Sequence, residues 1–290
     1  MSLLADVISA AGSVGRILRV PEPARRRALL STYLRVQFKY FVLVRLLGRK
    51  ITREHILGFT VEFAKYEQFL IVFCEIFVTQ VYRFTPVRPA PVIFDCGANI
   101  GMAAIYFKWM YPQSRIVAFE PEPATFELLK RNVEMNLLQN VELHCEAVGG
   151  APGTVPFYYL EGFPGWLAQS TVKPPDREAK IRMVPVVTLS PLITEEVDLL
   201  KVDTEGSEAA TFAELAETGK LRSIRASVLE YHHHMTPGDD SLSSFLAVLE
   251  RNGFGYMISA TYRTPFISGE FACLMIGAYR KELTGPIAPF

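Results

Sequence analysis

Residues 92–101 have the sequence Val92-Ile93-Phe94-Asp95-Cys96-Gly97-Ala98-Asn99-Ile100-Gly101. Three apolar residues and an acid precede a glycine-containing stretch, and apolar residues then continue at helical spacing to Phe107. This order predicts a buried strand, a tight turn and a helix. Gly97 and Gly101 have no Cβ atom, which suits a backbone that turns sharply or approaches a ligand. The free N–H groups at the start of the helix would point towards a ligand above the turn.

A second acid stands at the end of the next predicted strand. The apolar run Ile116-Val117-Ala118-Phe119 ends in Glu120, nineteen residues beyond Gly101. In nucleotide-binding strand–helix–strand units, an acid at this place accepts hydrogen bonds from the ribose hydroxyls of the ligand. A glycine turn alone is common in α/β folds, but the turn and Glu120 together indicate a nucleoside-containing cofactor.

The turn differs from the dinucleotide fingerprint G-x-G-x-x-G, in which three glycines accommodate a pyrophosphate. Here Asp95 precedes the turn, and its carboxylate would repel a pyrophosphate but attract an ammonium group. S-adenosylmethionine contains an amino-acid moiety, a sulfonium and a ribose, so it fits this pattern better than NAD. We therefore predict a methyltransferase, with an NAD-dependent oxidoreductase as the alternative.

The third predicted strand covers residues 141–145 and leads to Glu146 and Ala147. Loops at the carboxyl ends of strands gather ligand contacts in open sheets, so these two residues are candidates for the edge of the adenine. Glu146 is explained equally well as an ordinary surface acid, and the sequence leaves both interpretations open.

Two alternating stretches, residues 154–159 and 180–187, predict additional antiparallel strands. Between them lies an excursion from Glu161 to Ala179 that is rich in glycine and proline. Long irregular loops in compact domains often serve as lids. We expect residues 161–179 to form a lid over the acceptor site, with Trp166 in contact with the acceptor.

A second group of polar residues follows two further apolar runs. Asp203 and Glu205 follow the first run, at the edge where open parallel sheets bind ligands. Glu230 and His232 follow the second, and they share a face because side chains alternate along a strand. A divalent cation held by Asp203 and Glu230 is chemically feasible. The three consecutive histidines at 232–234 do not converge on one ion, which argues against structural zinc.

The composition limits the class of protein. The chain has 290 residues, half of them hydrophobic, and a formal net charge of zero. We expect a mainly helical extension over residues 1–85 and one α/β catalytic domain over residues 86–290. A neutral total gives no support for nucleic-acid binding. The four cysteines show no paired spacing and the N-terminus lacks the features of a signal peptide, so we expect a cytoplasmic protein.

Residues 16–53 contain eleven Arg or Lys residues and a single acid, Glu22. Residues 28–47 are long enough to span a bilayer, but their internal charges argue against a transmembrane helix. Four basic residues share one side of a helical wheel: Arg27, Arg35, Lys39 and Arg45. One interpretation is an interfacial helix on anionic lipid at the inner membrane face. The other is a helix that packs on the main domain or on a second subunit. A non-catalytic, membrane-associated scaffold is a further alternative.

Four ordered motifs resemble those of the FkbM-type methyltransferases. They are D-C-G-A-N-I-G at 95–101, F-E-P-E-P at 119–123, L-K-V-D-T-E-G-S-E at 200–208 and E-Y-H at 230–232. The resemblance implies a class I, Rossmann-like methyltransferase with a seven-stranded, mostly parallel sheet and helices on both faces. It also implies transfer of a methyl group from S-adenosylmethionine to a hydroxyl oxygen of a sugar, glycolipid or polyketide-like acceptor, with S-adenosylhomocysteine as the product.

Carried over to matching positions, the resemblance places the turn residues at the methionine end of the cofactor, Glu120 at the ribose, and Asp203 and Glu205 beside the methyl group. The full set of expected cofactor contacts is Asp95, Gly97, Ala98, Asn99, Gly101, Glu120, Pro121, Glu146, Ala147, Asp203 and Glu205.

The reaction requires a group that accepts the proton of the acceptor hydroxyl. We predict that His232 is this base and also contacts the acceptor, because an unperturbed imidazole titrates near neutral pH. Asp203 is the second candidate, and Glu230 is expected to take part beside them. The alternative is that His232 is a hydrogen-bonded support that orients Glu230.

Overall fold

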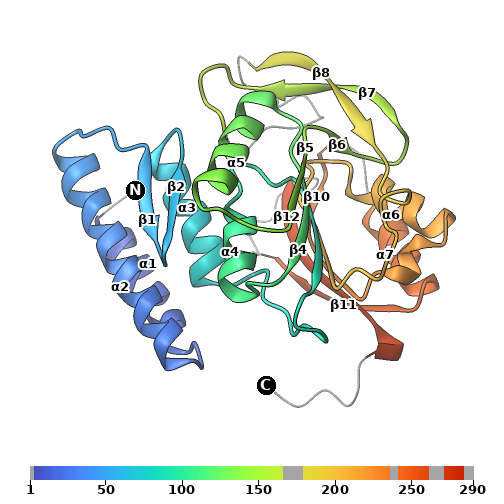
Figure 1. Cartoon of the computed structure of the whole chain (residues 1–290), viewed down its shortest axis with the longest axis horizontal. Helices are drawn as coiled ribbons and strands as arrows, with labels where there is room; N and C mark the ends of the chain where they lie inside the picture. The colour runs from blue at the N-terminus through green and yellow to red at the C-terminus, as the bar shows by residue number, and fades with distance from the viewer. Residues whose placement is uncertain (1–2, 166–178, 236–240, 261–270, 284–290) are drawn as a thin grey trace.

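The computed structural model describes residues 3–165, 179–235, 241–260 and 271–283 (Figure 1). Trp166 and most of the lid predicted for residues 161–179 lie outside these ranges. Within them, no helix combines the length and the apolar character that crossing a lipid bilayer requires.

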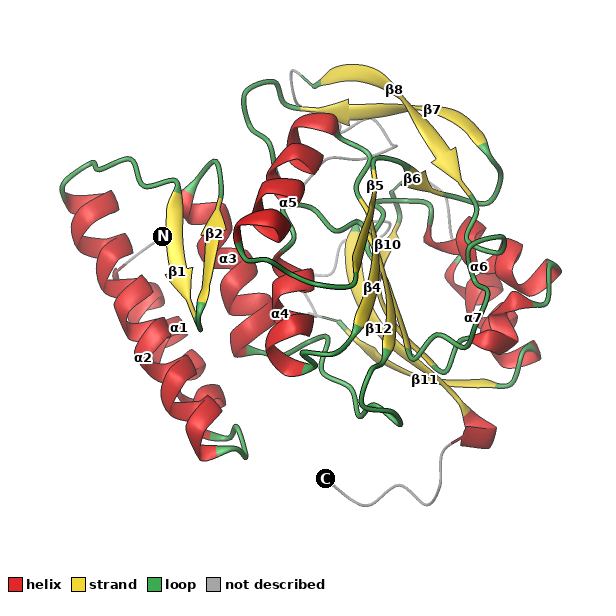
Figure 2. Ribbon diagram, in the orientation of Figure 1, coloured by secondary structure: helices red, strands yellow, loops and turns green. Residues whose placement is uncertain are grey.

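The centre of the molecule is a seven-stranded sheet in the order β11-β12-β10-β9-β3-β4-β5 (Figure 2). Its strands are β3 (Val92–Cys96), β4 (Arg115–Phe119), β5 (Val141–His144), β9 (Leu199–Val202), β10 (Ala226–His233), β11 (Phe254–Ser259) and β12 (Ala272–Arg280). Neighbouring strands from β10 to β5 are parallel. β12 is antiparallel to both β10 and β11. The predicted Rossmann-like class I methyltransferase fold, with a seven-stranded and mostly parallel sheet, is confirmed.

Helices cover both faces of this sheet (Figure 2). One face carries α4 (Met102–Met110) and α5 (Pro123–Met135), and the other carries α6 (Glu208–Glu217) and α7 (Leu242–Arg251). All residues of β3 and β9 are buried, as expected for central parallel strands that are covered on both sides. α5 begins where it does because Pro123 suits a first helical turn and the Glu122 carboxylate accepts a hydrogen bond from Thr125 N.

The N-terminal segment packs against α4. It consists of α1 (Leu3–Leu18), α2 (Pro23–Lys39), the π-helix η1 (Tyr40–Leu46), the hairpin strands β1 (Arg53–Ile56) and β2 (Phe59–Glu62), α3 (Tyr66–Phe73) and the π-helix η2 (Cys74–Val78). A series of aromatic contacts runs from this segment into the main domain: Phe63–Phe69, Phe69–Phe73, Phe73–Phe77 and Phe77–Tyr106. Because Tyr106 belongs to α4, the segment and the sheet domain share one hydrophobic core.

A smaller sheet in the order β6-β8-β7 lies beside the main sheet (Figure 1). Its strands are β6 (Ala147–Val148), β7 (Gly153–Tyr159) and β8 (Lys180–Val187). β7 and β8 are antiparallel, as predicted. The strand predicted for residues 141–145 is β5, which ends at His144, and Ala147 and Val148 beyond it pair with β8. Two short 3₁₀ helices, η3 (Lys220–Ser223) and η4 (Lys281–Leu283), complete the described elements.

Candidate active site

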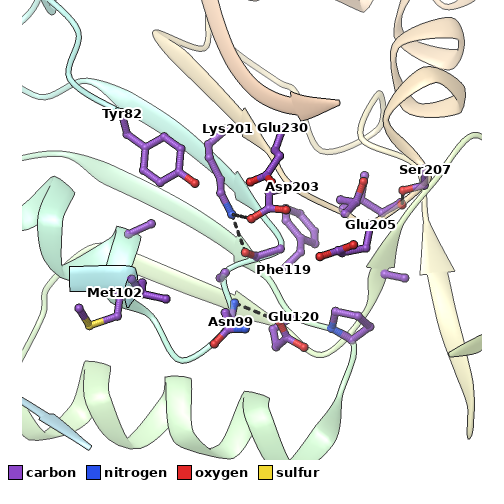
Figure 3. A pocket seen from close by; sticks show the side chains of 18 of the residues that line it. Tyr82, Asn99, Met102, Phe119, Glu120, Lys201, Asp203, Glu205, Ser207 and Glu230 are labelled. Carbon is purple, nitrogen blue, oxygen red and sulfur yellow. Dashed lines mark hydrogen bonds and ion pairs between the residues drawn. The ribbon is translucent and has the colours of Figure 1, made fainter. Parts of the chain in front are cut away.

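A pocket of about 230 Å³ lies at the carboxyl ends of β3, β4, β9 and β10 (Figure 3). Open parallel sheets bind their ligands at this edge. The turn after β3, the end of β4, the start of β6 and the segment after β9 supply most of its wall. The N-terminal segment completes the wall with residues of α3 and η2 and with Tyr82.

The turn between β3 and α4 depends on two glycines. Gly97 has a φ of +83°, and a Cβ atom there would lie 1.8 Å from the carbonyl oxygen of Asp203. Gly101 has a φ of +89° and immediately precedes α4. The N–H groups of Gly97 and Ala98 donate hydrogen bonds to the carbonyl oxygen of Phe119, at 3.0 and 2.8 Å. Only glycine therefore allows the turn to approach both β4 and the segment after β9 so closely.

Glu120 is a buried acid whose position at the end of β4 is fixed by the backbone. Asn99 N donates to Glu120 Oε2 at 3.0 Å, and Glu122 N donates to Glu120 Oε1 at 2.9 Å. Burial raises the pKa of Glu120 to about 8, although the two hydrogen bonds oppose this shift. The side chain lines the pocket (Figure 3). It is therefore placed to accept hydrogen bonds from the hydroxyl groups of a ligand.

Lys201 lines the pocket and connects the motif at residues 95–101 with the motif at residues 200–208. Its Nζ lies 3.2 Å from Asp95 Oδ1 and 3.7 Å from Asp203 Oδ2, and it donates to the carbonyl oxygen of Gly97 at 2.5 Å. Burial alone would lower the pKa of Lys201, but the neighbouring negative charges, that of Asp95 above all, raise it above its ordinary value. Asp95 is fully buried against this amine, beneath the turn rather than in the pocket wall.

Three carboxyl groups of the pocket wall interact electrostatically, namely Glu75 of η2, Asp203 after β9 and Glu230 of β10. Asp203 and Glu230 lie apart from Glu120 (Figure 3), and Glu205 also lines the pocket, within 4.8 Å of Asp203. Burial, together with the negative charges of Glu230 and Asp203, raises the pKa of Glu75 to about 7. Figure 3 shows Asp203 and Glu230 next to each other, with Tyr82 on the far side of Lys201. This end of the pocket therefore contains a carboxyl group that exchanges its proton near neutral pH.

His232 is buried behind the pocket wall. Its Nδ1 lies 2.9 Å from Glu208 Oε1, and its Nε2 lies 3.3 Å from Glu205 Oε2 and 4.0 Å from Glu230 Oε1. Burial alone would lower the pKa of His232, but hydrogen bonds with Cys273 and Glu208 and the charge of Glu205 raise it to about 12. An imidazole that keeps its proton at neutral pH does not accept another. These contacts favour the supporting role of His232 over the predicted role as base.

Two groups of side chains within the described residues have the spacing of cation ligands. They are Asp203, Glu205 and His232, and Glu230, His232 and Cys273, with all ligand atoms of a group within 4.8 Å of one another. His232 is common to both groups. Asp203 and Glu230, which the sequence suggested as a pair of ligands, belong to different groups.

Most residues predicted to contact the cofactor line the pocket. These are Gly97, Ala98, Asn99, Glu120, Pro121, Glu146, Ala147, Asp203 and Glu205. Two of the predicted contacts, Asp95 and Gly101, lie behind the wall instead, and Gly101 faces Leu129 of α5. The sequence left Glu146 as either a contact of the adenine or an ordinary surface acid. It lines the pocket, and its Oε2 also lies 3.3 Å from His144 Nδ1.

Sequence reasoning assigned no role to Glu75, Tyr82 or Lys201. Glu75 is an acid within an apolar helical run, and Lys201 is a lysine within a buried strand. A charged residue within an apolar run of the sequence is unusual, because such runs are normally buried. Both residues were therefore signals of a specific role. Tyr82 carried no such signal, because aromatic residues are frequent throughout the segment before it.

Comparison with known proteins identifies the family. The sequence model described as "Methyltransferase FkbM domain" matches residues 95–256, which is more than half of the chain. The family that the four motifs predicted is thus confirmed. "Methyltransferase 1" of Beauveria bassiana (strain ARSEF 2860) is 33% identical over 157 residues, covering 46% of this chain and 62% of that protein. "Methyltransferase sdnD" of Sordaria araneosa is 32% identical over 172 residues, covering 47% of this chain and 65% of that protein.

The match therefore spans slightly less than two thirds of the length of these two fungal relatives. The "31-O-demethyl-FK506 methyltransferase FkbM" of Streptomyces tacrolimicus is 29% identical over 230 residues, covering 68% of this chain and 86% of that protein. Among solved structures, methyltransferase FkbM of Methylobacillus flagellatus KT is 15% identical, with a TM-score of 0.42, covering 71% of this chain and 53% of that chain.

Proposed function

The chain belongs to the FkbM methyltransferase family, and from this premise we propose that it transfers a methyl group from S-adenosylmethionine to a hydroxyl oxygen of a small acceptor of the sugar, glycolipid or polyketide type. The observation that carries the proposal is the division of the pocket into two ends. The Glu120 carboxyl, fixed by two backbone N–H groups, lies at one end, and three clustered carboxyl groups lie at the other.

The residues at the first end fit the nucleoside part of S-adenosylmethionine. Glu120 presents a carboxyl group from which the ribose hydroxyls can be held. The turn from Gly97 to Asn99 brings backbone close to the ligand, and Glu146 and Ala147 are placed for the edge of the adenine. The negatively charged surroundings of Asp203 and Glu230 fit a ligand whose sulfonium and ammonium groups are positive.

The bound cofactor supplies a methyl group on a sulfonium, whose bonding electrons return to sulfur when the acceptor oxygen takes the methyl. The protein must then hold the acceptor in line with that bond, and alignment of this kind contributes up to roughly 7–11 kcal/mol in favourable intramolecular reactions. Val72, Ile76 and Tyr82 form the wall beside the three carboxyl groups and would position the acceptor.

The proton of the acceptor hydroxyl passes to a carboxylate at this end. We assign that role to Glu75, because its pKa of about 7 suits general base catalysis at neutral pH. Asp203 remains the second candidate, and it lies within reach of the positive charge of Lys201. His232 holds Glu205 and Glu208 in place, and through Glu205 it supports the wall of the pocket.

Hydroxyl oxygen as the acceptor atom is supported by the name of one relative, since a 31-O-demethyl-FK506 methyltransferase acts on an oxygen. The four cysteines are free, which accords with a reducing compartment, and we place the reaction in the cytoplasm.

Titration calorimetry with the purified chain tests the cofactor assignment. We expect binding of S-adenosylmethionine and of S-adenosylhomocysteine, with no comparable binding of NAD. A preference for NAD would point to the oxidoreductase alternative. Failure to bind any of these three ligands would favour the non-catalytic scaffold.

A further inference from the structure

Helix α2 uses one of its faces for packing within the molecule. Leu29, Tyr33 and Val36 are fully buried in the core that the N-terminal segment shares with α4. The carbonyl oxygen of Val36 also accepts a hydrogen bond from the Tyr66 hydroxyl at 3.2 Å. This packing agrees with one of the two interpretations of the basic helix.

Other residues of α2 and of the segment that follows it leave large apolar side chains in solvent. Leu34 is 53% exposed, Phe38 63%, Leu46 76% and Leu47 58%. Leu34 and Phe38 are four residues apart on α2, about one helical turn, whereas Leu46 ends the π-helix η1 and Leu47 follows it. Single exposed apolar residues are ordinary, but these four lie on two consecutive helical segments, and they are here called the outer stripe.

The charged residues along the chain segment that carries the outer stripe are all positive. Between Pro23 and Arg53 the chain contains no acidic residue. Arg27 lies at the start of the stripe, and Arg49 and Lys50 lie just beyond its end, and all three are exposed. The stripe therefore combines apolar side chains with cations at both ends and no acid of its own.

Two residues of the predicted basic face have a different use. Lys39 Nζ lies 2.8 Å from Glu54 Oε1, and Arg35 Nε lies 4.0 Å from the same oxygen. Glu54 is buried, so these two cations attach α2 to the β1–β2 hairpin. The predicted basic face therefore divides into an inner pair that stabilises the fold and the exposed Arg27 and Arg45, and Arg49 and Lys50 add two exposed cations beyond it.

We propose that the outer stripe and its flanking cations bind the surface of an anionic lipid bilayer. Apolar side chains along one helix, flanked by Arg and Lys, enter the interface between headgroups and acyl chains, while the cations contact anionic headgroups. Opposite charge selects this partner, since a surface without acids offers no salt bridge to a second copy of itself. In Figure 1, α2 lies at the edge of the molecule opposite α6 and α7, where a flat bilayer can approach it. The proposal does not depend on the methyl-transfer reaction.

Vesicle co-sedimentation with the full chain tests the proposal. We expect the chain to sediment with vesicles that contain phosphatidylglycerol and to stay in solution with pure phosphatidylcholine vesicles. In the Leu34→Ser/Phe38→Ser variant, binding to the anionic vesicles should be lost. The Arg49→Gln/Lys50→Gln variant should bind roughly 25-fold more weakly, about fivefold for each cation removed.

Matched controls come from surfaces away from the stripe. Ile181→Ser/Met183→Ser removes two apolar residues of β8 that are exposed to a similar degree, and Arg251→Gln removes an exposed cation at the end of α7. Both controls should sediment like the unmodified chain. Circular dichroism and S-adenosylmethionine binding, measured on every variant, separate a loss of lipid binding from misfolding and from failure of the proposed function.

Equal sedimentation of the stripe variant and the unmodified chain, or no sedimentation of the unmodified chain with anionic vesicles, would overturn the proposal. Light scattering that shows a dimer which the stripe variant abolishes would also overturn it and would assign the stripe to a second copy.

Discussion

The two ends of the pocket are built in different ways. Most of the end proposed for the nucleoside comes from one continuous stretch of chain, in which a strand, a turn, a helix and a second strand place Gly97 and Glu120 side by side. Glu146 and Ala147 join this end from the segment after β5. The acceptor end combines Glu75 from the N-terminal segment, Asp203 after β9 and Glu230 of β10. The family match begins at residue 95, so Glu75 and Tyr82 lie outside it.

The proposed function assigns cofactor binding to one end and acceptor binding to the other. In the proposed function, the end that is assembled locally would hold the nucleoside part of S-adenosylmethionine. The end that is assembled from distant segments would supply the proton acceptor and the wall against which the acceptor molecule packs. Changes at the two ends should therefore separate turnover from cofactor affinity.

The largest expected effect is at the acceptor end. Glu75→Gln keeps the shape of the side chain and removes its ability to take a proton, so turnover should fall by roughly 10²–10⁴-fold. Affinity for S-adenosylmethionine, measured by calorimetry, should stay unchanged. His232→Gln serves as the comparison and should reduce turnover less, because His232 lies behind the wall. A larger loss for His232→Gln than for Glu75→Gln would return the role of base to the histidine.

The next effect concerns the ion pair between Lys201 in the pocket wall and the buried Asp95. Lys201→Met leaves the buried Asp95 carboxylate without its cation and should lower the free energy of unfolding by about 3–5 kcal/mol. Urea unfolding measures this loss. The double variant Asp95→Asn/Lys201→Met removes both charges and should recover much of it. Equal stability of the single and double variants would show that the pair contributes little.

At the end proposed for the nucleoside, Glu120→Gln keeps the side-chain length but replaces one carboxyl oxygen with an amide NH₂, which cannot accept a hydrogen bond from a ribose hydroxyl. Leaving a buried hydrogen-bonding group without its partner costs about 1–3 kcal/mol, so affinity for S-adenosylmethionine should fall roughly 5–150-fold. Turnover at saturating cofactor should change much less than in Glu75→Gln. A dissociation constant within twofold of the unmodified value would remove Glu120 from the cofactor site.

The smallest effect is a pH dependence. The pKa of Glu75 is raised to about 7, so its carboxyl is protonated below that pH and does not accept a proton. With Glu75 as base, kcat at saturating cofactor should be constant above about pH 8 and fall about tenfold per pH unit well below pH 7. Stopped assays across pH 5–9 measure this limb. The limb should be absent from the residual activity of Glu75→Gln, and its persistence there would assign it to another group.

The sequence predicts the locally assembled end of the pocket better than the end that is assembled from distant segments. The turn at Gly97 and the acid Glu120 were predictable because local patterns specify a strand, a turn and a helix, and the parallel register then fixes their neighbourhood. Glu75 was not, because its place depends on how the N-terminal segment packs on α4 through long-range aromatic contacts.

For Asp95 and His232, the sequence indicated the position in the strand but not the burial of the side chain. Asp95 and His232 were correctly placed at strand ends, but a carboxylate paired with Lys201 and an imidazole held between Glu205 and Glu208 have partners within the protein. Lys201 and Glu208 stand in the same quoted motif as Asp203, yet spacing alone does not reveal which side chains point at one another.

A crystal structure of the chain with S-adenosylhomocysteine tests the central claim most directly. We predict that the ribose hydroxyls contact the Glu120 carboxyl and that the sulfur faces the carboxyl groups of Glu75 and Asp203. A nucleoside bound elsewhere, or bound in this pocket with its sulfur turned away from Glu75 and Asp203, would contradict the division of the pocket into a cofactor end and an acceptor end.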